Sequence, residues 1–239
     1  MRHLDLTLPS LAENLALDEA LVVDAEAGTG PPTLRTWELD HLGVVLGASG
    51  RLREDVDVDA CRADGVAIGR RSSGGGTVLI GPGALNFTVV LPIESDPRLA
   101  AVDTAQLYVL GRTAEALRSA GADARVLGSG DLTLDGRKFS GSAQRRLKRH
   151  VMVHASLLYA IPAGLIARYT RPPARQPEYR RGRSHEDFLT LIPLSRRRIM
   201  EALRSAWSAE GPADVGPPTG LVGRLVAEKF GREDWISRL

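Results

Sequence analysis

A glycine-rich segment at residues 70–78 has the residue types and the spacing of an anion-binding loop. It has the sequence RRSSGGGTV: two adjacent arginines, two serines and three glycines, followed by an apolar run. Glycines let backbone N–H groups approach an oxyanion closely, and arginine adds a planar fork of donors that fits carboxylate or phosphate oxygens. No Gly-Lys-Ser/Thr follows, as in a Walker loop, and the G-x-G-x-x-G spacing is absent. Two arginines beside three glycines are unusual for a plain turn, so we expect the segment to bind an acidic ligand.

Lys138 is the second residue with a setting suited to chemistry. It follows an Asp-Gly pair at 135–136 and precedes the small residues Ser140-Gly141-Ser142, which allow a ligand or another backbone to approach closely. If this segment folds against the glycine-rich segment, the Lys138 ammonium group meets the same anion as Arg71. A point charge there suits an oxygen whose negative charge grows during a reaction.

Asp131 begins the same segment, and its residue type fits three roles. It could cap a turn, which is common for aspartate at such a boundary. It could instead orient Lys138, or bind a magnesium ion together with the phosphates of a nucleotide. The sequence leaves these roles open.

His150 and His154 have the i, i+4 spacing of a zinc-binding pair on a helix. However, HVMVHASLLY alternates and contains valines, which predicts a strand. At about 3.3 Å per residue, the two side chains would lie roughly 13 Å apart on one face. They therefore cannot share a metal, and His154 either faces the ligand or is a structural histidine.

The chain has few residues that could form a covalent intermediate. Its single cysteine, Cys61, has acidic neighbours and no nearby histidine in the sequence, so we expect a buried, unreactive side chain. No G-x-S-x-G nucleophile elbow occurs. Many anion-binding groups and few nucleophiles suit an activated acyl group that is bound noncovalently, such as an acyl-adenylate.

The composition fits one large domain in a soluble protein. The chain has 239 residues, of which 43% are hydrophobic and 25% charged. A net charge of +2, with four Tyr and four Phe, argues against nucleic-acid binding. No leader-like or membrane-spanning apolar segment occurs, which predicts a cytoplasmic protein that does not bind membranes. Five arginines at 171–183 form a basic segment that we interpret as a lid or a docking surface for an acidic acceptor.

Hydrophobic periodicity and turn signals predict an α+β fold with a mixed, largely antiparallel sheet and helices to one side. Ser10 and Glu13 have the spacing of a capping box for a helix that ends near Gly28, with its apolar residues on one face. We expect TVLI and NFTVVL to flank a hairpin or a bulged turn around GPG at 81–83, and Asp135-Gly136 to form a type I′ turn. Further helices are predicted at 55–62, 103–121, after Ser195 and at 220–229.

Over most of its length the chain resembles the lipoate–protein ligase branch of the biotin/lipoate ligase superfamily. NLALDEAL resembles the opening helix of that family, and RRSSGGGTV with GPGALNFTVVL resembles its ligand-binding loop and next strand. DLTLDGRKFSGSAQRR is similar to the lysine motif D-L-x-x-x-G-R-K-x-S-G-S-A. VHASLL stands in place of H-G-T-L-L, and VAEKFGREDW resembles the end of the catalytic domain.

The resemblance implies two reaction steps. Lipoate is joined to AMP from MgATP with release of pyrophosphate, and the acyl group then passes to a lysine of a lipoyl acceptor domain. Lys138 would be catalytic and touch the acyl and phosphate oxygens in both steps. Asp131, near the nucleotide, is the one residue we connect with Mg²⁺. The residues implied for substrate and adenylate binding are Arg71, Ser73, Gly74, Gly75, Gly76, Asn86, Asp131, Ser140, Gly141 and His154.

The chain departs from the family pattern at three places. A histidine usual after the triple glycine is Ile80 or Gly81 here, and an asparagine that often precedes the aspartate is Gly130. Little more than a helix follows Trp235, so the smaller C-terminal domain, which assists adenylation in relatives, is missing from this sequence. A separate accessory subunit could supply it, the catalytic domain at 1–239 could act alone, or the protein could act without ATP.

The last option corresponds to an octanoyl or lipoyl transferase that moves acyl groups between carrier proteins. Some of these use a cysteine after the lysine motif, and none occurs there in this chain. A biotin ligase is not indicated, because its G-R-G-R-x-x-G and K-W-P-N-D motifs are absent. A non-catalytic lipoyl or nucleotide binder would not need both Arg71 and Lys138. We therefore expect an ATP-dependent lipoate–protein ligase.

Overall fold

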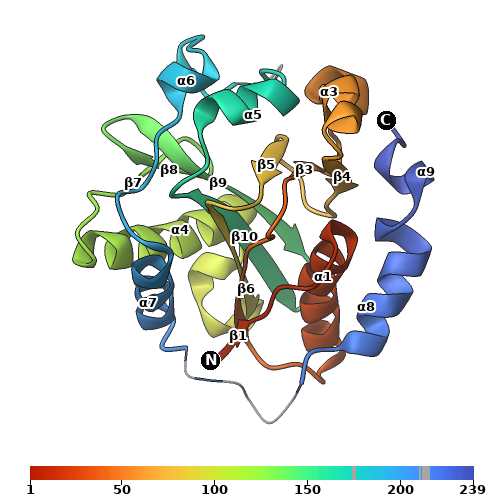
Figure 1. The fold of residues 1–239 in the computed structure, drawn as a ribbon. Coiled ribbons are helices and arrows are strands. Elements are labelled where there is room, and N and C mark those ends of the chain that lie inside the picture. The colour runs from red at the N-terminus through yellow and green to blue at the C-terminus, as the bar shows by residue number, and fades with distance from the viewer. Residues whose placement is uncertain (174–175, 210, 212–215) are drawn as a thin grey trace.

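A seven-stranded sheet forms the centre of the molecule (Figure 1). The computed structural model describes residues 1–173, 176–209, 211 and 216–239. In this sheet only β1 and β2 pair in parallel, so the expectation of a largely antiparallel α+β fold is confirmed. In spatial order its strands are β1 (Arg2–Asp5), β2 (Thr33–Trp37), β6 (Ala84–Pro92), β10 (His150–Leu158), β9 (Arg137–Arg146), β8 (Asp131–Leu134) and β7 (Arg125–Leu127).

A second, three-stranded sheet carries the glycine-rich segment. Its strands, in the order β4 (Ala67–Arg70), β3 (Gly43–Leu46) and β5 (Val78–Ile80), place that segment between β4 and β5. The predicted hairpin around residues 81–83 is wrong, because β5 pairs with β3 whereas β6 pairs with β2 and β10. Gly81 and Gly83, with φ of 146° and 96°, lie where the chain passes from one sheet to the other.

Helices cover both faces of the large sheet, so the expectation that they lie to one side is wrong. In Figure 1, α4 and α7 lie on one side, and α1 and α8 lie on the other. The helix predicted at 55–62 is two short helices, α2 and α3, because Asp57 between them caps the second. The α-helices are α1 (Leu11–Ala27), α2 (Leu52–Asp55), α3 (Val58–Ala63), α4 (Val102–Ser119), α5 (Ala163–Tyr169), α6 (His185–Phe188), α7 (Arg196–Ala206), α8 (Thr219–Leu225) and α9 (Glu233–Ile236). Single 3₁₀ turns are η1 (Ile93–Ser95), η2 (Pro97–Leu99) and η3 (Glu178–Arg180), and a π-helical turn, η4 (Val226–Phe230), extends α8.

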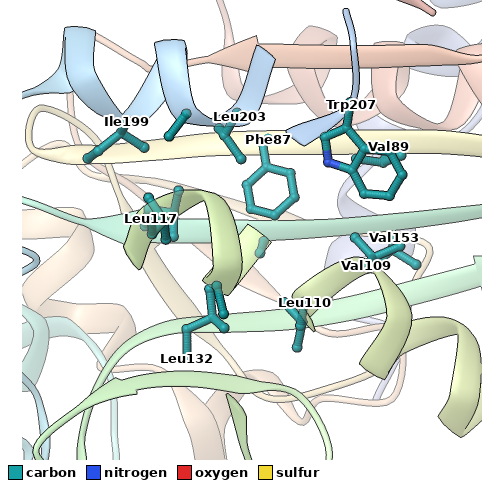
Figure 2. Close-up of a cluster of buried hydrophobic side chains, with 14 of the residues drawn as sticks. Phe87, Val89, Val109, Leu110, Leu117, Leu132, Val153, Ile199, Leu203 and Trp207 are labelled. Atoms are coloured by element: carbon teal, nitrogen blue, oxygen red, sulfur yellow. The ribbon is translucent and has the colours of Figure 1, made fainter. Parts of the chain in front are cut away.

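The main hydrophobic core lies between the large sheet and the helices α4 and α7 (Figure 2). Phe87 on β6 and Val153 on β10 point toward Leu110 of α4 and Leu203 of α7, and all four are at most 1% exposed. Alternate residues of β10 therefore face this core, and the intervening residues, including His154, face α1.

Helix α1 is buried on nearly all sides. Its predicted capping box between Ser10 and Glu13 is present, and Gly28, with φ of 83°, ends the helix as predicted. The expected single apolar face is wrong, because α1 packs against both sheets and α8. Asn14, Asp18 and Glu19 are consequently buried with the leucines around them.

The predicted type I′ turn and the predicted strand HVMVHASLLY at 150–159 are both confirmed. Asp135 and Gly136 have φ of 49° and 71° and connect β8 to β9. His150–Leu158 is a strand, as the alternation predicted. No helix within the described residues is long and apolar enough to cross a membrane.

The C-terminal segment is fastened to the start of the glycine-rich segment by Arg70. Its guanidinium donates to the carbonyl oxygen of Ile236 at 2.7 and 3.0 Å and to that of Gly50 at 2.6 Å. The indole N–H of Trp235 donates to the carbonyl oxygen of Arg70 at 2.9 Å, and the Arg238 guanidinium lies 3.9 Å from the centre of the Trp235 ring.

Candidate active site

The Arg71 side chain lies beneath the glycine-rich loop and holds its backbone in place. Its guanidinium donates to the carbonyl oxygens of Gly74 at 2.5 Å and Gly76 at 2.8 Å, and to that of Val45 on β3 at 3.3 Å. Its Nε–H also donates to the Ser73 hydroxyl at 3.1 Å. The loop is therefore folded around a cation.

This cation has no acidic partner within the described part of the chain. Arg71 is 7% exposed, and all its hydrogen bonds are to neutral oxygens. Burial lowers the pKa of Arg71 to about 10, which still leaves it protonated at neutral pH. A buried charge is costly unless it is paired, so an anion that reaches this loop would be strongly stabilised.

Close packing fixes the path of the loop at Gly75. A Cβ at Gly47 would lie only 1.9 Å from the carbonyl oxygen of Gly75, so the backbones approach closely at this point. Gly75 itself has φ of 85°, and a Cβ there would lie 3.7 Å from the Cβ of Ala143 on β9. By contrast, a Cβ at Gly74 or Gly76 would meet open space. The lysine-motif hairpin thus folds against the loop, as the sequence argument required.

Lys138 is held by a partly buried carboxylate on the neighbouring strand. Its Nζ lies 2.7 Å from Oδ1 of Asp131, and Oδ2 of Asp131 accepts a hydrogen bond from the Tyr179 hydroxyl at 2.6 Å. Gly141 makes room for the lysine, because a Cβ there would lie 2.8 Å from Nζ. Burial and the adjacent Asp131 raise the pKa of Tyr179, so this hydroxyl remains a donor.

Of the roles that the sequence left open for Asp131, the structure shows the orientation of Lys138. Both carboxylate oxygens are engaged, by Lys138 and by Tyr179. No group of three or more His, Cys, Asp or Glu residues suited to a metal occurs in the described ranges. An ion bound to Asp131 would share this carboxylate with Lys138 and Tyr179.

Ser73 and His154 meet on the face of the sheet that α1 covers. The Oγ of Ser73 lies 2.6 Å from Nε2 of His154, and Nδ1 of His154 lies 3.2 Å from Oδ2 of Asp18. The other oxygen of Asp18 accepts from the Arg35 guanidinium at 2.6 Å. Burial alone would raise the pKa of Asp18, but the charge of Arg35 and the contact with His154 outweigh it and lower that pKa.

Two other predicted site residues lie on opposite faces of the large sheet. Asn86 pairs with Ser156 across β6 and β10, on the His154 face, and accepts a hydrogen bond from the Ser156 hydroxyl at 2.6 Å. Ser140 pairs with Leu157, a core residue on the opposite face, and is 1% exposed. The structure thus places Asn86 on the same face of the sheet as His154 and leaves Ser140 on the core face.

Sequence reasoning missed Asp18, Arg35 and Tyr179. Asp18 was counted as part of an amphipathic helix, although Asn14 and Asp18 at i, i+4 amid leucine and alanine indicate buried polar groups that need partners. Arg35 in a strand with hydrophobic neighbours carries the same signal. Tyr179 lies in an irregular segment, so nothing local identifies its contact with Asp131.

The basic segment at 171–183 has a partly structural role, and Arg175 lies outside the described residues. Arg180 is 3% exposed, with its guanidinium 4.8 Å from the centre of the Phe188 ring. Arg183 donates to the carbonyl oxygens of Gly136 and Tyr179 at 3.1 and 2.8 Å. Arg183 thus fastens the segment to the turn of the lysine-motif hairpin, and Arg180 packs against Phe188 instead of presenting its charge to a partner.

The single cysteine is buried in the core, as predicted. Cys61 on α3 is 1% exposed, and burial raises the pKa of its thiol. It packs with the apolar residues of the small sheet and α5. The site therefore consists of a buried guanidinium, an ammonium group and a hydroxyl–imidazole–carboxylate chain, which suits binding an acyl phosphate and transferring its acyl group.

Comparisons with known proteins find one family of similar proteins. Residues 10–192 match the lipoyl protein ligase A/B catalytic domain family. The chain is 30% identical over 196 residues to a protein of Aeropyrum pernix provisionally named lipoate-protein ligase A, covering 82% of this chain and 70% of the relative. It is also 30% identical to the octanoyltransferase LipM of Symbiobacterium thermophilum, covering 95% of this chain and 94% of the relative.

A solved structure from Thermoplasma acidophilum has the same fold. It is described as a bi-partite lipoate protein ligase and its E2 lipoyl domain, and it superposes with a TM-score of 0.82 at 25% identity over 99% of this chain and 95% of its own. On the family match over more than half of its length, this chain belongs to the lipoyl protein ligase A/B catalytic-domain family.

Proposed function

We propose that this protein is an ATP-dependent lipoate–protein ligase. It would convert lipoate, or a related medium-chain acid, to acyl-AMP with MgATP and transfer the acyl group to a lysine of a lipoyl acceptor domain. Arg71 and Ser73 would bind the acyl phosphate beside Gly74, Gly75 and Gly76. Lys138 would stabilise the charge that develops on the acyl and phosphate oxygens in both steps.

The observation that carries this proposal is the buried Arg71 guanidinium without an acidic partner. The Lys138 ammonium, paired with Asp131, lies on the hairpin that packs against the loop. The phosphate of an acyl-AMP carries one negative charge, which matches the unpaired Arg71 guanidinium, and the intermediate stays noncovalently bound. The similarity to the Aeropyrum pernix protein supports the same assignment.

An ATP-independent octanoyltransferase is the second candidate, and the similarity to LipM favours it. LipM of Symbiobacterium thermophilum matches 95% of this chain and is 30% identical to it, the same identity as the Aeropyrum pernix protein. A thioester route through a cysteine near the lysine motif is not open to this chain, because Cys61 is its only cysteine and is buried in α3. The ATP-dependent ligase is therefore the first candidate, ahead of the octanoyltransferase.

We further propose that residues 1–239 act as one catalytic unit that cooperates with a separate accessory subunit. The Thermoplasma acidophilum relative, which is described as bi-partite, supports this arrangement. Adding candidate small subunits to the purified protein should then raise the rate of adenylate formation and leave acyl transfer from preformed acyl-AMP unchanged.

Intact-mass analysis of a lipoyl acceptor domain tests the function directly. The domain is incubated with the protein, lipoate and MgATP, in parallel with a reaction that lacks ATP and one that contains an octanoyl carrier protein instead. We expect a gain of one lipoyl mass that requires ATP. A gain from the octanoyl carrier without ATP would establish the transferase instead. No gain in any reaction, with bound lipoate or nucleotide detected by calorimetry, would indicate a non-catalytic binder.

A further inference from the structure

Ser73, His154 and Asp18 form a continuous hydrogen-bonded chain that the binding of an acyl phosphate does not require. They come from the glycine-rich loop, from β10 and from α1, so three distant parts of the sequence build it. Ser73 is 1% exposed, Asp18 is 2% exposed and the His154 side chain is 12% exposed. This hydrogen-bonded series is therefore shielded from bulk water, and its Ser73 end lies in the loop that would contact the ligand.

The partners of each atom define where the hydrogens lie. Asp18 is ionised and can only accept, so Nδ1 of His154 carries a hydrogen and donates to Asp18. In the neutral form of the imidazole, Nε2 is then an acceptor for the hydrogen of the Ser73 hydroxyl, 2.6 Å away. Ser73 Oγ in turn accepts from the Nε–H of Arg71. Ser73 and His154 thus each point an acceptor toward the loop and a donor toward the interior, and Asp18 ends the series as an acceptor.

The charged groups around the imidazole support this polarity. Arg35 pairs with Asp18 from the side opposite His154, and it is fully buried. Arg71 approaches from the loop side, through Ser73. Ala143, the cross-strand partner of His154 on β9, lies under Gly75, so the imidazole is next to the closed face of the loop.

We propose that Ser73, His154 and Asp18 are a proton relay that takes up the proton of the attacking acceptor lysine during acyl transfer. In the transfer step the lysine nitrogen forms a bond to the acyl carbon, and the bond from that carbon to the phosphate oxygen breaks, with its electron pair leaving on AMP. The nitrogen loses its proton to Ser73 Oγ as the Ser73 proton moves to Nε2 of His154. Asp18 is a positioning residue that holds the imidazole and stabilises its charged form.

The inference rests on the proposed acyl transfer but not on the source of the acyl group. Aminolysis of an acyl-adenylate and of an acyl thioester both release one proton from the attacking nitrogen. Adenylate formation has no such step, since its nucleophile is a carboxylate. The relay therefore predicts a difference between the two half-reactions that a purely structural role would not produce.

The strand itself provides a matched control for His154. His150 lies four residues earlier on β10, on the same face, and its Nδ1 contacts a carboxylate of the same helix, Glu26, at 3.2 Å. It differs from His154 in that no serine hydroxyl of the described residues contacts its second ring nitrogen. The variants His154→Gln and His150→Gln thus change the same side chain in the same kind of setting.

Single-turnover transfer to an acceptor domain tests the relay, with synthetic lipoyl-AMP or an octanoyl carrier thioester as donor. For His154→Gln we expect transfer at least about 100-fold slower at unchanged KM for the acceptor, and pyrophosphate exchange within about threefold of the native rate. His150→Gln should leave both unchanged. In His154→Ala, added imidazole should restore part of the transfer rate. Asp18→Asn should slow transfer in the same selective way, provided that its circular dichroism stays native.

Three results would overturn the relay. They are normal transfer in His154→Gln, an equal loss in both half-reactions, or no rescue of His154→Ala by imidazole. If the native protein uses the thioester and not lipoyl-AMP, the proposed ligase fails while the relay is still tested with the thioester. If the native protein uses neither donor, both proposals fail together.

Discussion

The Lys138 ammonium group is the one charge in the site that can change partners without unfolding its surroundings. It is paired with Asp131, and its side chain is about one-quarter exposed, at 26%. Removing it should leave the fold intact, because the Asp131 carboxylate keeps its hydrogen bond from Tyr179.

We predict that Lys138→Ala lowers the rate of acyl transfer at least about 10²-fold, since it removes a positive charge aimed at developing negative charge. The measurement is transfer to an acceptor domain under saturating substrates, with the melting temperature as a check of folding. Lys148→Ala, at an exposed position, is the control and should keep native activity. Near-native turnover in a folded Lys138→Ala protein would remove this lysine from the mechanism.

Asp18 should also make stability depend on pH. Its pKa is lowered in the folded protein, so its contribution is present above the unfolded pKa of about 4 and is lost as pH falls through the folded value. At pH 7 we predict that Asp18→Asn costs about 3–5 kcal/mol, because Arg35 remains buried without its charge partner. Urea unfolding at pH 7 and below pH 4 measures this difference. A difference that stays constant over that range would contradict the assignment.

At the scale of elements, the glycine-rich loop depends on Gly47 as much as on its own glycines. Any side chain at this position after β3 would collide with the carbonyl oxygen of Gly75 and displace the loop from Arg71 and β9. The displacement acts on the geometry of the bound ligand, and a shift of about 1 Å can cost roughly 10²-fold in rate.

We therefore predict that Gly47→Ala lowers kcat/KM by about 10²-fold while the protein still folds. Steady-state kinetics of acceptor modification provide the measurement. Gly111→Ala in α4, where an added Cβ meets open space, is the matched control and should keep native kinetics with slightly higher stability. Equal kinetics for both variants would mean that the contact with Gly75 does not position the loop.

The elements that the sequence predicted correctly are those whose signals are local. The capping box of α1, the Asp-Gly turn at 135–136 and the alternation of β10 each depend on residues close together in the chain. The pairing of β5 and β6 was not predictable in this way, because their actual partners, β3 and β10, lie far away in the sequence. Local turn residues indicated a change of direction but not the change of sheet.

The residues of the candidate site differ in the same way, since some belong to local sequence motifs and others meet only in the folded structure. Arg71, Lys138 and the three glycines form recognisable motifs, and the structure brings the two motifs together. Asp18 and Arg35 meet His154 only through the packing of α1 on the large sheet, so no spacing in the sequence links them. The apolar residues around Asp18 and Arg35 in the sequence indicated that both are buried. Which residues they contact could be learned only from the fold.

At the scale of the whole molecule, Arg70 joins the C-terminal segment to the loop between β3 and α2. Its buried guanidinium donates to the carbonyl oxygens of Gly47 and Gly50 in this loop and of Ile236 in the C-terminal segment. Removing the guanidinium would leave all three oxygens without this donor. We predict that Arg70→Met lowers the free energy of unfolding by roughly 3 kcal/mol. Urea denaturation measures the loss, with Arg62→Met, whose side chain is 80% exposed, as a control expected within about 0.5 kcal/mol of native. A native-like midpoint for Arg70→Met would show that the C-terminal segment is held by other contacts.

The hydrogen bond from the Trp235 indole to the carbonyl oxygen of Arg70 gives the protein a built-in optical reporter. The indole of Trp235 is hydrogen-bonded to the peptide group that joins Arg70 to Arg71. Its ring lies beside the cationic groups of Arg238 and Lys229, which quench or shift the fluorescence emission according to their distance. We predict that titration with lipoyl-AMP changes the tryptophan fluorescence and that Trp235→Phe abolishes most of the change. Trp207, buried against α4 on the far side of the sheet, should emit unchanged, so its replacement by phenylalanine serves as the control.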